Sequence, residues 1–415
     1  MSKTVYPGFL SGEIDIIPSK SYIHRYLIAA ALADSPTQIV AKSDAIDVLA
    51  TTACLKGMGA DIEYTDGVFE VFPITGQIEE IAVLPCEESG STLRFLLPLT
   101  LALGQAAQFK TAGRLAERPL GALVDCLSAH GGQIHSKNPL QVYGKLTAGD
   151  YNIAGNISSQ YITGLLFALP ILDGDSKIII EGGITSGDYI NITLQVLAEF
   201  GIKIQRTEYG FYVLGGQKYI SPKQVVVEGC WSNAAFFLVA GAIAGDLVIK
   251  GLNMKSAQGD KAILDILQNA NVQIKVENGK IHIKKSKFYS FLVDGENIPD
   301  IIPILAVAGI GGYDTSIFQN LTRLRDKESD RLLATTDMLN RVGIATRTNG
   351  INLTVECGTP CGGEVLGYND HRIVMAASVL ALASKNPITI SDTHAVAKSY
   401  PQFFDEFVRL GGKIQ

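Results

Sequence analysis

The sequence predicts a two-domain α/β protein built from six repeats of about seventy residues, in which apolar helices are surrounded by sheets. Three observations support this prediction. Two motifs recur in independent registers with the same period, and one helix of each repeat is apolar on nearly all sides. The length of 415 residues also exceeds one ordinary core of roughly 100 to 150 residues.

The first recurring motif ends a helical pattern and begins a pair of strands. Its first position is Gly59, Gly131, Gly201, Asn271, Gly343 or Gly411, at intervals of 72, 70, 70, 72 and 68 residues. In the second motif a strand runs into a polar elbow and then an apolar helix. It passes through Lys20, Ser89, Ser159, Ser232, Asp300 and Asp370, at intervals of 69, 70, 73, 68 and 70 residues. Chance is a poor explanation for two independent series of motifs with the same period. We therefore infer that six units of this size account for the whole chain.

Each unit is expected to run strand, helix, strand, helix, strand, strand. The first helix, as at 234–244, is apolar nearly all round and should be buried on every side. The second helix has apolar residues at helical spacing, such as Ile190, Leu194 and Leu197, and ends at the Gly or Asn of the first motif. Alternating strands follow, as at 61–71.

Three units in each domain would bury all six apolar helices. This symmetry gives one domain of residues 18–228 and another of residues 1–17 plus 229–415. No linker rich in Pro or Ser marks the cut, so tight chain crossings are expected to join the halves.

Composition narrows the function class. A formal charge of −6 argues against wholesale binding to nucleic acid or to an anionic membrane. The six cysteines form no CxxC framework, and Cys357 and Cys361 lack two further ligands nearby, so we expect free thiols and no metal. The chain shows neither a leader pattern nor an apolar run of about 20 residues, which favours a cytoplasmic protein without membrane contact.

Basic side chains gather within a turn or two of the expected helix starts. These side chains are Lys20, Arg25, Arg94, Arg118, Lys327, Arg331, Arg372 and Lys398. A cation at a helix start is unfavourable by up to ~1 kcal/mol, so the clustering predicts a compensating anion that carries carboxylate and phosphate groups. The alternative, for any one of them, is an ordinary surface cation paired with Asp or Glu. Repetition at equivalent positions weakens that alternative.

Four acids lie among these cations. Asp330 and Asp370 are interpreted as helix caps, whereas a catalytic role competes with capping for Asp300 and Glu328.

Seven short strings occur in a fixed order along nearly the whole chain. They are PSKSYIHR (18–25), ESGSTLR (88–94), RLAERP (114–119), SSQ (158–160), KESDR (327–331), YNDHR (368–372) and AKSYP (397–401). Together they resemble the motifs of the 5-enolpyruvylshikimate-3-phosphate (EPSP) synthase family, the enolpyruvyl transferases of the shikimate pathway. The resemblance implies an inside-out α/β barrel of two domains, with the active site in the cleft between them.

The resemblance also implies a reaction and its ligands. The enolpyruvyl group of phosphoenolpyruvate would move to the 5-hydroxyl of shikimate 3-phosphate, with release of phosphate and without a cofactor. Shikimate 3-phosphate would be held, mostly by the first domain, at Lys20, Ser21, Arg25, Ser158, Ser159, Gln160, Ser186, Tyr189, Asp300 and Lys327. Phosphoenolpyruvate would be held at Lys20, Gly90, Arg118, Gln160, Arg331, Arg372 and Lys398. No macromolecular partner is expected, and the protein should act as a monomer.

This chemistry needs both an acid and a base. Our hypothesis makes Asp300 the base at the hydroxyl, and Glu328 and Lys398 the candidates for proton transfer at the methylene carbon. Lys20 would assist the departure of phosphate. Domain closure would hold the two substrates in attack geometry, which can supply ~7 to 11 kcal/mol of the barrier.

Two rival functions remain open. The UDP-N-acetylglucosamine enolpyruvyl transferases share the architecture, but their loop usually carries a reactive Cys at the position that aligns with Gly113. A non-catalytic anion-binding relative is the other rival. Its support is a shortened PSKS loop, Glu88 in place of a usual Asn and Ser91 in place of a usual Thr. Retention of both candidate acids and all eight cations argues against it.

Overall fold

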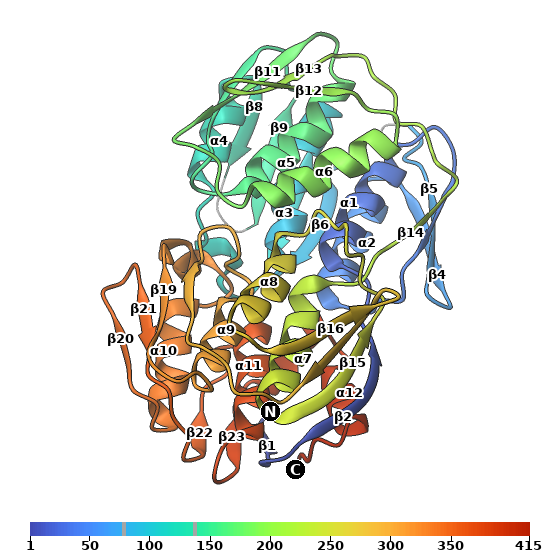
Figure 1. Ribbon diagram of the computed structural model, residues 1–415. Helices are drawn as coiled ribbons and strands as arrows, with labels where there is room; N and C mark the ends of the chain where they lie inside the picture. Colours follow the sequence, from blue (N-terminus) through green and yellow to red (C-terminus); the bar gives the residue numbers. More distant parts are fainter. Residues whose placement is uncertain (77–79, 136–138) are drawn as a thin grey trace. The chain divides into compact units, whose positions relative to one another are not determined.

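The computed structural model describes residues 1–76, 80–135 and 139–415, and the chain divides into two compact units (Figure 1). The N-terminal unit comprises residues 18–227, and the C-terminal unit comprises residues 1–17 and 228–415. Glu228, at the expected cut, belongs to the C-terminal unit, where its carboxylate accepts hydrogen bonds from Asn253, Ser256 and Gln258.

The first helix of each repeat is buried over most of its length. These helices are α1 (Lys20–Ala31), α3 (Gly90–Ala102), α5 (Ser159–Ala168), α7 (Trp231–Ala244), α9 (Ile302–Gly309) and α11 (His371–Leu382). Every residue of α7 is buried. Within the C-terminal unit α7, α9 and α11 contact one another, and within the N-terminal unit α3 contacts α5. This burial confirms the prediction of central, buried helices. Its physical reason is that a helix that is apolar all round is stable only when it is covered on all sides.

The second helix of each repeat is amphipathic or short. These helices are α2 (Ile46–Gly57), α4 (Gly121–Ser128), α6 (Gly187–Glu199), α8 (Ala262–Asn269), α10 (Arg331–Arg341) and α12 (Phe403–Arg409). Short 3-10 helices precede four of them: η1 (Gly113–Glu117), η3 (Gly259–Lys261), η4 (Thr322–Asp326) and η5 (Thr393–Lys398). A further 3-10 helix, η2 (Leu169–Ile171), directly follows α5. The residues of the first motif end the α-helices in left-handed backbone conformation, as Asn271 does with a φ of 66°.

The sheets of both units follow one plan, a parallel pair of strands extended by antiparallel strands. In the N-terminal unit the sheet orders are β14-β3-β5-β4, β6-β7-β9-β8 and β10-β11-β13-β12. The strands are β3 (Thr37–Val40), β4 (Asp61–Thr65), β5 (Val68–Phe72), β6 (Ala82–Glu87), β7 (Ala107–Thr111), β8 (Gly132–His135), β9 (Leu140–Gly144), β10 (Asp150–Ala154), β11 (Ser176–Glu181), β12 (Ile204–Thr207), β13 (Gly210–Val213) and β14 (Gln224–Val226).

In the C-terminal unit the orders are β16-β17-β15-β2, β18-β19-β21-β20 and β1-β23-β22. The strands are β1 (Lys3–Val5), β2 (Leu10–Asp15), β15 (Gly245–Lys250), β16 (Gln273–Glu277), β17 (Lys280–Lys284), β18 (Leu292–Asp294), β19 (Ser316–Gln319), β20 (Thr346–Thr348), β21 (Leu353–Val355), β22 (Gly363–Val365) and β23 (Ile388–Ile390). In each unit the strands lie outside the buried helices (Figure 1), so the fold is the expected inside-out α/β arrangement.

The chain crossings exchange the first strands of two repeats. Strand β2 directly precedes α1 in the sequence but pairs in parallel with β15, from Leu10 opposite Gly245 to Asp15 opposite Lys250. Strand β14 directly precedes α7 but pairs in parallel with β3. The N-terminal strand β1 completes the last repeat by pairing with β23. Three repeats are therefore not continuous in sequence. The period along the chain could not reveal this, because it does not specify which copy a strand joins.

Candidate functional site

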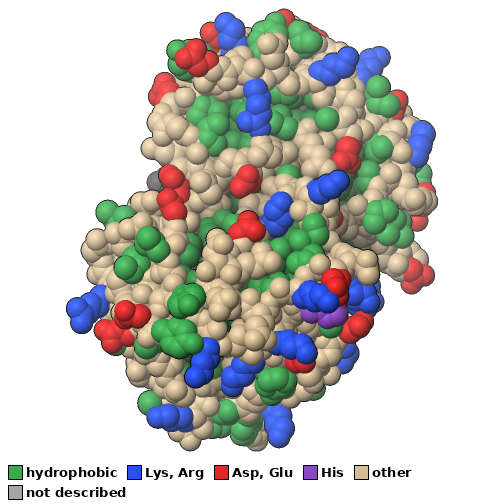
Figure 2. All heavy atoms as spheres, in the orientation of Figure 1, with side chains coloured by type: hydrophobic (Ala, Val, Ile, Leu, Met, Phe, Trp, Pro, Cys, Tyr) green, Lys and Arg blue, Asp and Glu red, His purple; other side chains and the backbone are tan. Residues whose placement is uncertain are grey.

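The elbows of the second motif begin the buried helices, as predicted. Lys20 is the first residue of α1, and Gly90 and Ser159 are the first residues of α3 and α5. On the face drawn in Figure 2, Lys and Arg side chains are interspersed with Asp and Glu side chains. The positions of individual charges therefore describe the site better than their sum does.

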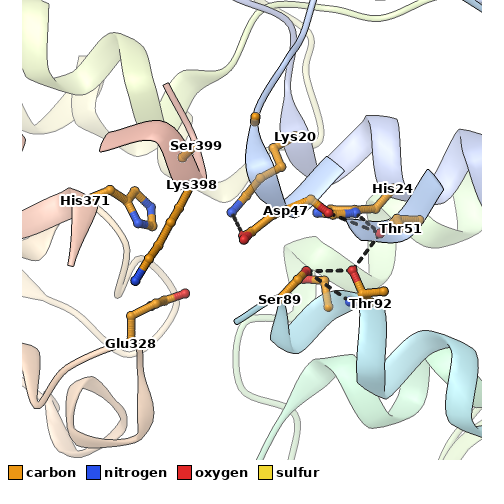
Figure 3. A network of polar contacts seen from close by, with 12 residues as sticks. Lys20, His24, Asp47, Thr51, Ser89, Thr92, Glu328, His371, Lys398 and Ser399 are labelled. Carbon is orange, nitrogen blue, oxygen red and sulfur yellow. Dashed lines mark hydrogen bonds and ion pairs between the residues drawn. The ribbon is translucent and has the colours of Figure 1, made fainter. Parts of the chain in front are cut away.

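Lys20 forms an ion pair with Asp47, which lies in the first turn of α2 (Figure 3). The Lys20 side chain is 18% exposed and that of Asp47 is 10% exposed. Sequence analysis missed Asp47, because an acid in the first turn of a helix is an ordinary capping feature. Pairing with Asp47 fixes the ammonium of Lys20 at the start of α1.

Arg25 is a buried cation that joins α1 to α6. Its Nε donates to Thr193 Oγ1 at 2.8 Å, and its Nη1 and Nη2 donate to the backbone oxygens of Ser21 and Tyr189 at 2.7 and 3.0 Å. Burial lowers the pKa of Arg25 to about 10. No carboxylate pairs with Arg25 among the residues that the structure describes. The predicted ligands Ser21, Arg25 and Tyr189 thus lie together, around a positive charge that an anion would stabilise.

Gly90 lies directly against the guanidinium of Arg118. A Cβ at Gly90 would be 2.7 Å from Arg118 Nη1 and 3.1 Å from Arg94 Nη1, so only glycine allows this approach. Arg94 Nη1 also donates to Gln160 Oε1 at 2.7 Å, and Gln160 Nε2 donates to Ser91 Oγ at 2.9 Å. The start of α3 and the start of α5 therefore present Gly90, Arg118 and Gln160 together.

Serines occupy the starts of α5 and α6 in the N-terminal unit. Ser158 caps α5 and accepts from the backbone N–H of Gln160 at 3.3 Å, while Ser159 is buried beside it. Ser186 precedes α6 with a φ of 53°, a left-handed conformation that is uncommon for serine.

Glu88, which departs from the usual Asn of the family motif, lies against Gly113. A Cβ at Gly113 would be 2.4 Å from Glu88 Oε2, and Gly113 has a φ of 52°. The absence of a side chain at Gly113 thus makes room for the Glu88 carboxylate.

Arg331 organises the acids of the C-terminal unit. Its guanidinium is 1% exposed and donates to Asp300 Oδ1 at 2.7 Å, to Glu328 Oε2 at 2.6 Å and to Asp370 Oδ2 at 2.8 Å. Asp370 also accepts from Ser329 Oγ at 2.9 Å and from the backbone N–H of Arg372 at 2.9 Å. The expected caps are confirmed, since Asp370 caps α11 and Asp330 caps α10 by accepting from the N–H of Leu333. Asp370 additionally holds Arg331.

Three cations surround the candidate base Asp300. Besides the bond from Arg331, Lys327 Nζ lies 3.7 Å from Asp300 Oδ1 and Arg372 Nη2 lies 3.8 Å from Asp300 Oδ2. Burial alone would raise the pKa of Asp300, but these cations outweigh burial and hold the pKa well below its ordinary value. Burial lowers the pKa of Lys327 to about 8, against the attraction of Asp300.

Lys398 and Glu328 lie on the same side of the C-terminal unit. Lys398 Nζ donates to the backbone oxygen of Asn369 at 2.6 Å, and Asn369 has a left-handed φ of 49°. In Figure 3 the Lys398 side chain passes His371 and its ammonium points toward Glu328. Lys398 is only 6% exposed, so the unit keeps a buried cation beside a carboxylate.

The local setting of three cations differs from the prediction. Arg118 and Lys327 directly follow η1 and η4, and Lys398 is the last residue of η5. The carbonyl end of a helix favours a cation, so local electrostatics supports these three cations instead of opposing them. Lys20, Arg331 and Arg372 do oppose the helix dipole, because they lie in the first turns of α1, α10 and α11.

Asp260 is a site residue that sequence analysis missed. Its side chain accepts a hydrogen bond from Ser232 Oγ and is 3% exposed, and among the described residues its Oδ1 has no hydrogen-bond partner. Burial and the negative charge of Asp300 raise the pKa of Asp260 to about 6, while Arg372 and Lys327 oppose that rise. The sequence signal was weak, because Asp260 lies in η3, away from every recurring motif.

Comparison with known proteins gives one consistent result. The chain matches the family model EPSP synthase (3-phosphoshikimate 1-carboxyvinyltransferase) over residues 6–407. It is 38% identical to a 3-phosphoshikimate 1-carboxyvinyltransferase of Clostridium beijerinckii, over 98% of this chain and 97% of that protein. A relative of the same name from Brachyspira hyodysenteriae is 36% identical over the full length of both.

Solved structures share the fold. EPSP synthase from Acinetobacter baumannii superposes with a TM-score of 0.84 at 24% identity, over 100% of this chain and 99% of that chain. The enolpyruvyl transferase NikO from Streptomyces tendae superposes with a TM-score of 0.82 at 17% identity, over 100% of this chain and 98% of that chain. Within the described residues, no helix has the length and hydropathy needed to cross a membrane.

Proposed function

Because the chain belongs to the EPSP synthase family, we propose that the polar clusters of its two units act together on one pair of substrates, phosphoenolpyruvate and shikimate 3-phosphate. The chain is an enolpyruvyl transferase of aromatic amino acid biosynthesis. It transfers the enolpyruvyl group of phosphoenolpyruvate to the 5-hydroxyl of shikimate 3-phosphate and releases phosphate.

Shikimate 3-phosphate binds mainly to the N-terminal unit in this proposal. The buried guanidinium of Arg25, which lacks a carboxylate among the described residues, supports a phosphate ligand there. The proposed contacts from this unit are Lys20, Ser21, Arg25, Ser158, Ser159, Gln160, Ser186 and Tyr189. Asp300 and Lys327 would reach the same substrate from the C-terminal unit when the units close on it.

Phosphoenolpyruvate binds to cations of both units. Gly90 allows Arg118 to lie at the start of α3, and Gln160 lies in the adjacent hydrogen-bonded group. Arg372 and Lys398 contribute from the C-terminal unit, and Lys20 contacts both substrates. Within the described residues Arg331 donates four hydrogen bonds to carboxylates, which leaves one of its five N–H groups for phosphoenolpyruvate. Its larger role is to hold Asp300 and Glu328 in place.

The observation that carries this assignment is the position of the Asp300 carboxylate among Lys327, Arg331 and Arg372. These cations keep Asp300 ready to accept a hydrogen bond but make it a weak base. Substrate anions that bind Lys327 and Arg372 offset their positive charge and raise the pKa of Asp300. The base therefore becomes effective only when both substrates are present.

The steps follow from these positions. Asp300 takes the proton of the 5-hydroxyl as its oxygen bonds to C2 of phosphoenolpyruvate, while Glu328 or Lys398 gives a proton to C3. The resulting tetrahedral intermediate still carries the phosphate on C2. Lys20 stabilises the leaving phosphate as the C2–O bond breaks, and the residue that protonated C3, Glu328 or Lys398, takes a proton back from C3, which forms the enol ether product.

The proposal is tested by phosphate release. Release should require phosphoenolpyruvate and shikimate 3-phosphate together, and UDP-N-acetylglucosamine should not replace the second substrate. Release with UDP-N-acetylglucosamine alone as acceptor would support the rival transferase. No release with either acceptor would support a non-catalytic relative.

We also infer that the chain works as a monomer in the cytoplasm. One chain carries all the proposed residues, and its relatives use small metabolites. Light scattering across the protein concentrations of the assay tests whether the chain is a monomer. A rise in molar mass would contradict the monomer, and an unchanged specific activity would then show that catalysis does not depend on assembly.

A further inference from the structure

Four buried side chains form a continuous hydrogen-bonded chain across α1, α2 and α3 (Figure 3). His24 Nδ1 lies 2.7 Å from Thr51 Oγ1, and Thr51 Oγ1 lies 2.6 Å from Thr92 Oγ1. Thr92 Oγ1 donates to Ser89 Oγ at 2.7 Å. Each of the four side chains is at most 1% exposed. The chain ends at the N-cap of α3, one residue before Gly90.

The supply of hydrogens fixes the direction of this chain. A hydroxyl carries one hydrogen, and that of Thr92 goes to Ser89. Thr51 must therefore donate to Thr92, at a distance much shorter than its 3.4 Å contact with the backbone oxygen of Asp47. His24 must in turn donate from Nδ1 to Thr51. Each donor is thus assigned, and a reversed chain would need Ser89 to donate to Thr92 and His24 to carry its hydrogen on Nε2.

The charge and the tautomer of His24 follow from its burial and from the direction of these hydrogen bonds. Burial and the positive charges of Lys20 and Arg25 hold the pKa of His24 well below its usual value, so the imidazole is neutral. Its hydrogen is on Nδ1, which leaves Nε2 as an acceptor. In the described part of the chain, Nε2 has no hydrogen-bond partner. The imidazole therefore acts toward its neighbours as a single donor.

We propose that His24 and Thr51 are positioning residues for phosphoenolpyruvate. Their hydrogen-bonded chain fixes the first turn of α3, and with it Gly90 against Arg118, relative to α1 and α2. A shift of either helix would break a link and leave a buried donor or acceptor unpaired, which is strongly unfavourable. This inference rests on the proposed function, which places phosphoenolpyruvate at Gly90 and Arg118.

The variant Thr51→Val tests the chain, because it removes the hydroxyl at nearly constant volume. The KM for phosphoenolpyruvate should rise ~10-fold, since a small misplacement of a binding group is costly, while the affinity for shikimate 3-phosphate stays within about twofold. Thr51→Ser should restore the KM. Thr52→Val is the matched control, because Thr52 donates to the backbone oxygen of Val48, outside the chain. A purely structural role would lower the melting temperature and leave KM unchanged, and that result would overturn the proposal.

His24 gives a second test that does not depend on Thr51→Val folding. His24→Asn retains a donor near the position of Nδ1 and should keep the KM for phosphoenolpyruvate, whereas His24→Leu should raise it. Nitrogen NMR of the wild-type imidazole should show the neutral Nδ1–H tautomer from pH 6 to 8. An Nε2–H tautomer would overturn the assignment.

Arg118→Met separates this inference from the proposed function. A raised KM in Arg118→Met together with an unchanged KM in Thr51→Val would overturn the positioning role and leave the proposed site standing. An unchanged KM in Arg118→Met would overturn the proposed phosphoenolpyruvate site and, with it, this inference.

Discussion

Asp300 accepts a 2.7 Å hydrogen bond from Nη1 of Arg331, and the same buried guanidinium holds Glu328. One cation therefore orients both acids proposed to move protons. Because both carboxylates bind the same guanidinium, their positions are coupled. The effect on kcat of replacing one acid can therefore be compared directly with the effect of replacing the other.

Replacing Asp300 with Asn should remove the base and retain a hydrogen-bond acceptor for Arg331. We expect kcat to fall by at least about 100-fold, the range of general base catalysis, with little change in the melting temperature. Steady-state phosphate release measures this loss. Asp330→Asn is the matched control, since Asn caps a helix as well as Asp does, and it should keep near-normal kcat. Equal kcat in Asp300→Asn and wild type would exclude Asp300 as the base.

Gly90→Ala should weaken the binding of phosphoenolpyruvate. The added Cβ would lie 2.7 Å from Arg118 Nη1, so the guanidinium must move. We expect the KM for phosphoenolpyruvate to rise about tenfold or more, with a smaller change in the affinity for shikimate 3-phosphate. Gly121→Ala, where a Cβ meets no atom within 4 Å, is the control. A larger effect on shikimate 3-phosphate would mean that the start of α3 serves the other substrate.

Binding of shikimate 3-phosphate should weaken above pH 8. The pKa of Lys327 is about 8, so the free protein loses this positive charge as the pH rises through that value. The affinity should be constant below pH 7 and fall above pH 8, by at most about tenfold per pH unit. Titration calorimetry from pH 6.5 to 9.5 checks this dependence. In Lys327→Arg the affinity should depend less on pH, because a guanidinium stays charged. The same pH dependence of the affinity in both proteins would contradict a contact between Lys327 and shikimate 3-phosphate.

Asp260 should make the protein less stable as the pH rises from about 4 to about 6. Its pKa is raised from 3.8 to about 6 on folding, so the folded state binds the proton more tightly than the unfolded chain. The contribution is complete below pH 4 and is lost as the pH passes 6, by at most about 3 kcal/mol. Urea unfolding of wild type and Asp260→Asn at pH 4.5 and 7 measures it. The free energy of unfolding of Asp260→Asn, relative to that of wild type, should be higher at pH 7 than at pH 4.5. A difference between the two proteins that does not change with pH would contradict the raised pKa of Asp260.

Much of the fold was predictable because local chemistry repeats. An apolar helix that follows a polar elbow can be recognised six times, and Lys20, Gly90 and Ser159 begin helices as expected. The exchange of β2 and β14 between repeats was not predictable, since both strands satisfy the same local pattern in either position. Strand partners are set by the packing of the whole unit.

The candidate site was predictable only in part. The cations stood out because several oppose the helix dipole or fall in family motifs. Asp47 and Asp260 could not be recognised, because their roles come from distant partners, Lys20 on α1 and Asp300 before α9. The setting of Arg118, Lys327 and Lys398 at the ends of 3-10 helices was also missed, since such short helices have little sequence periodicity.

The central claim is that residues of both units act on the same pair of substrates. The most direct measurement is kcat at saturating substrates for Lys20→Met, in the N-terminal unit, and Lys398→Met, in the C-terminal unit. Both variants should lose at least about 100-fold in kcat while each folds normally, because each removes a charge from the reacting groups. Near-normal turnover in either folded variant would contradict the account.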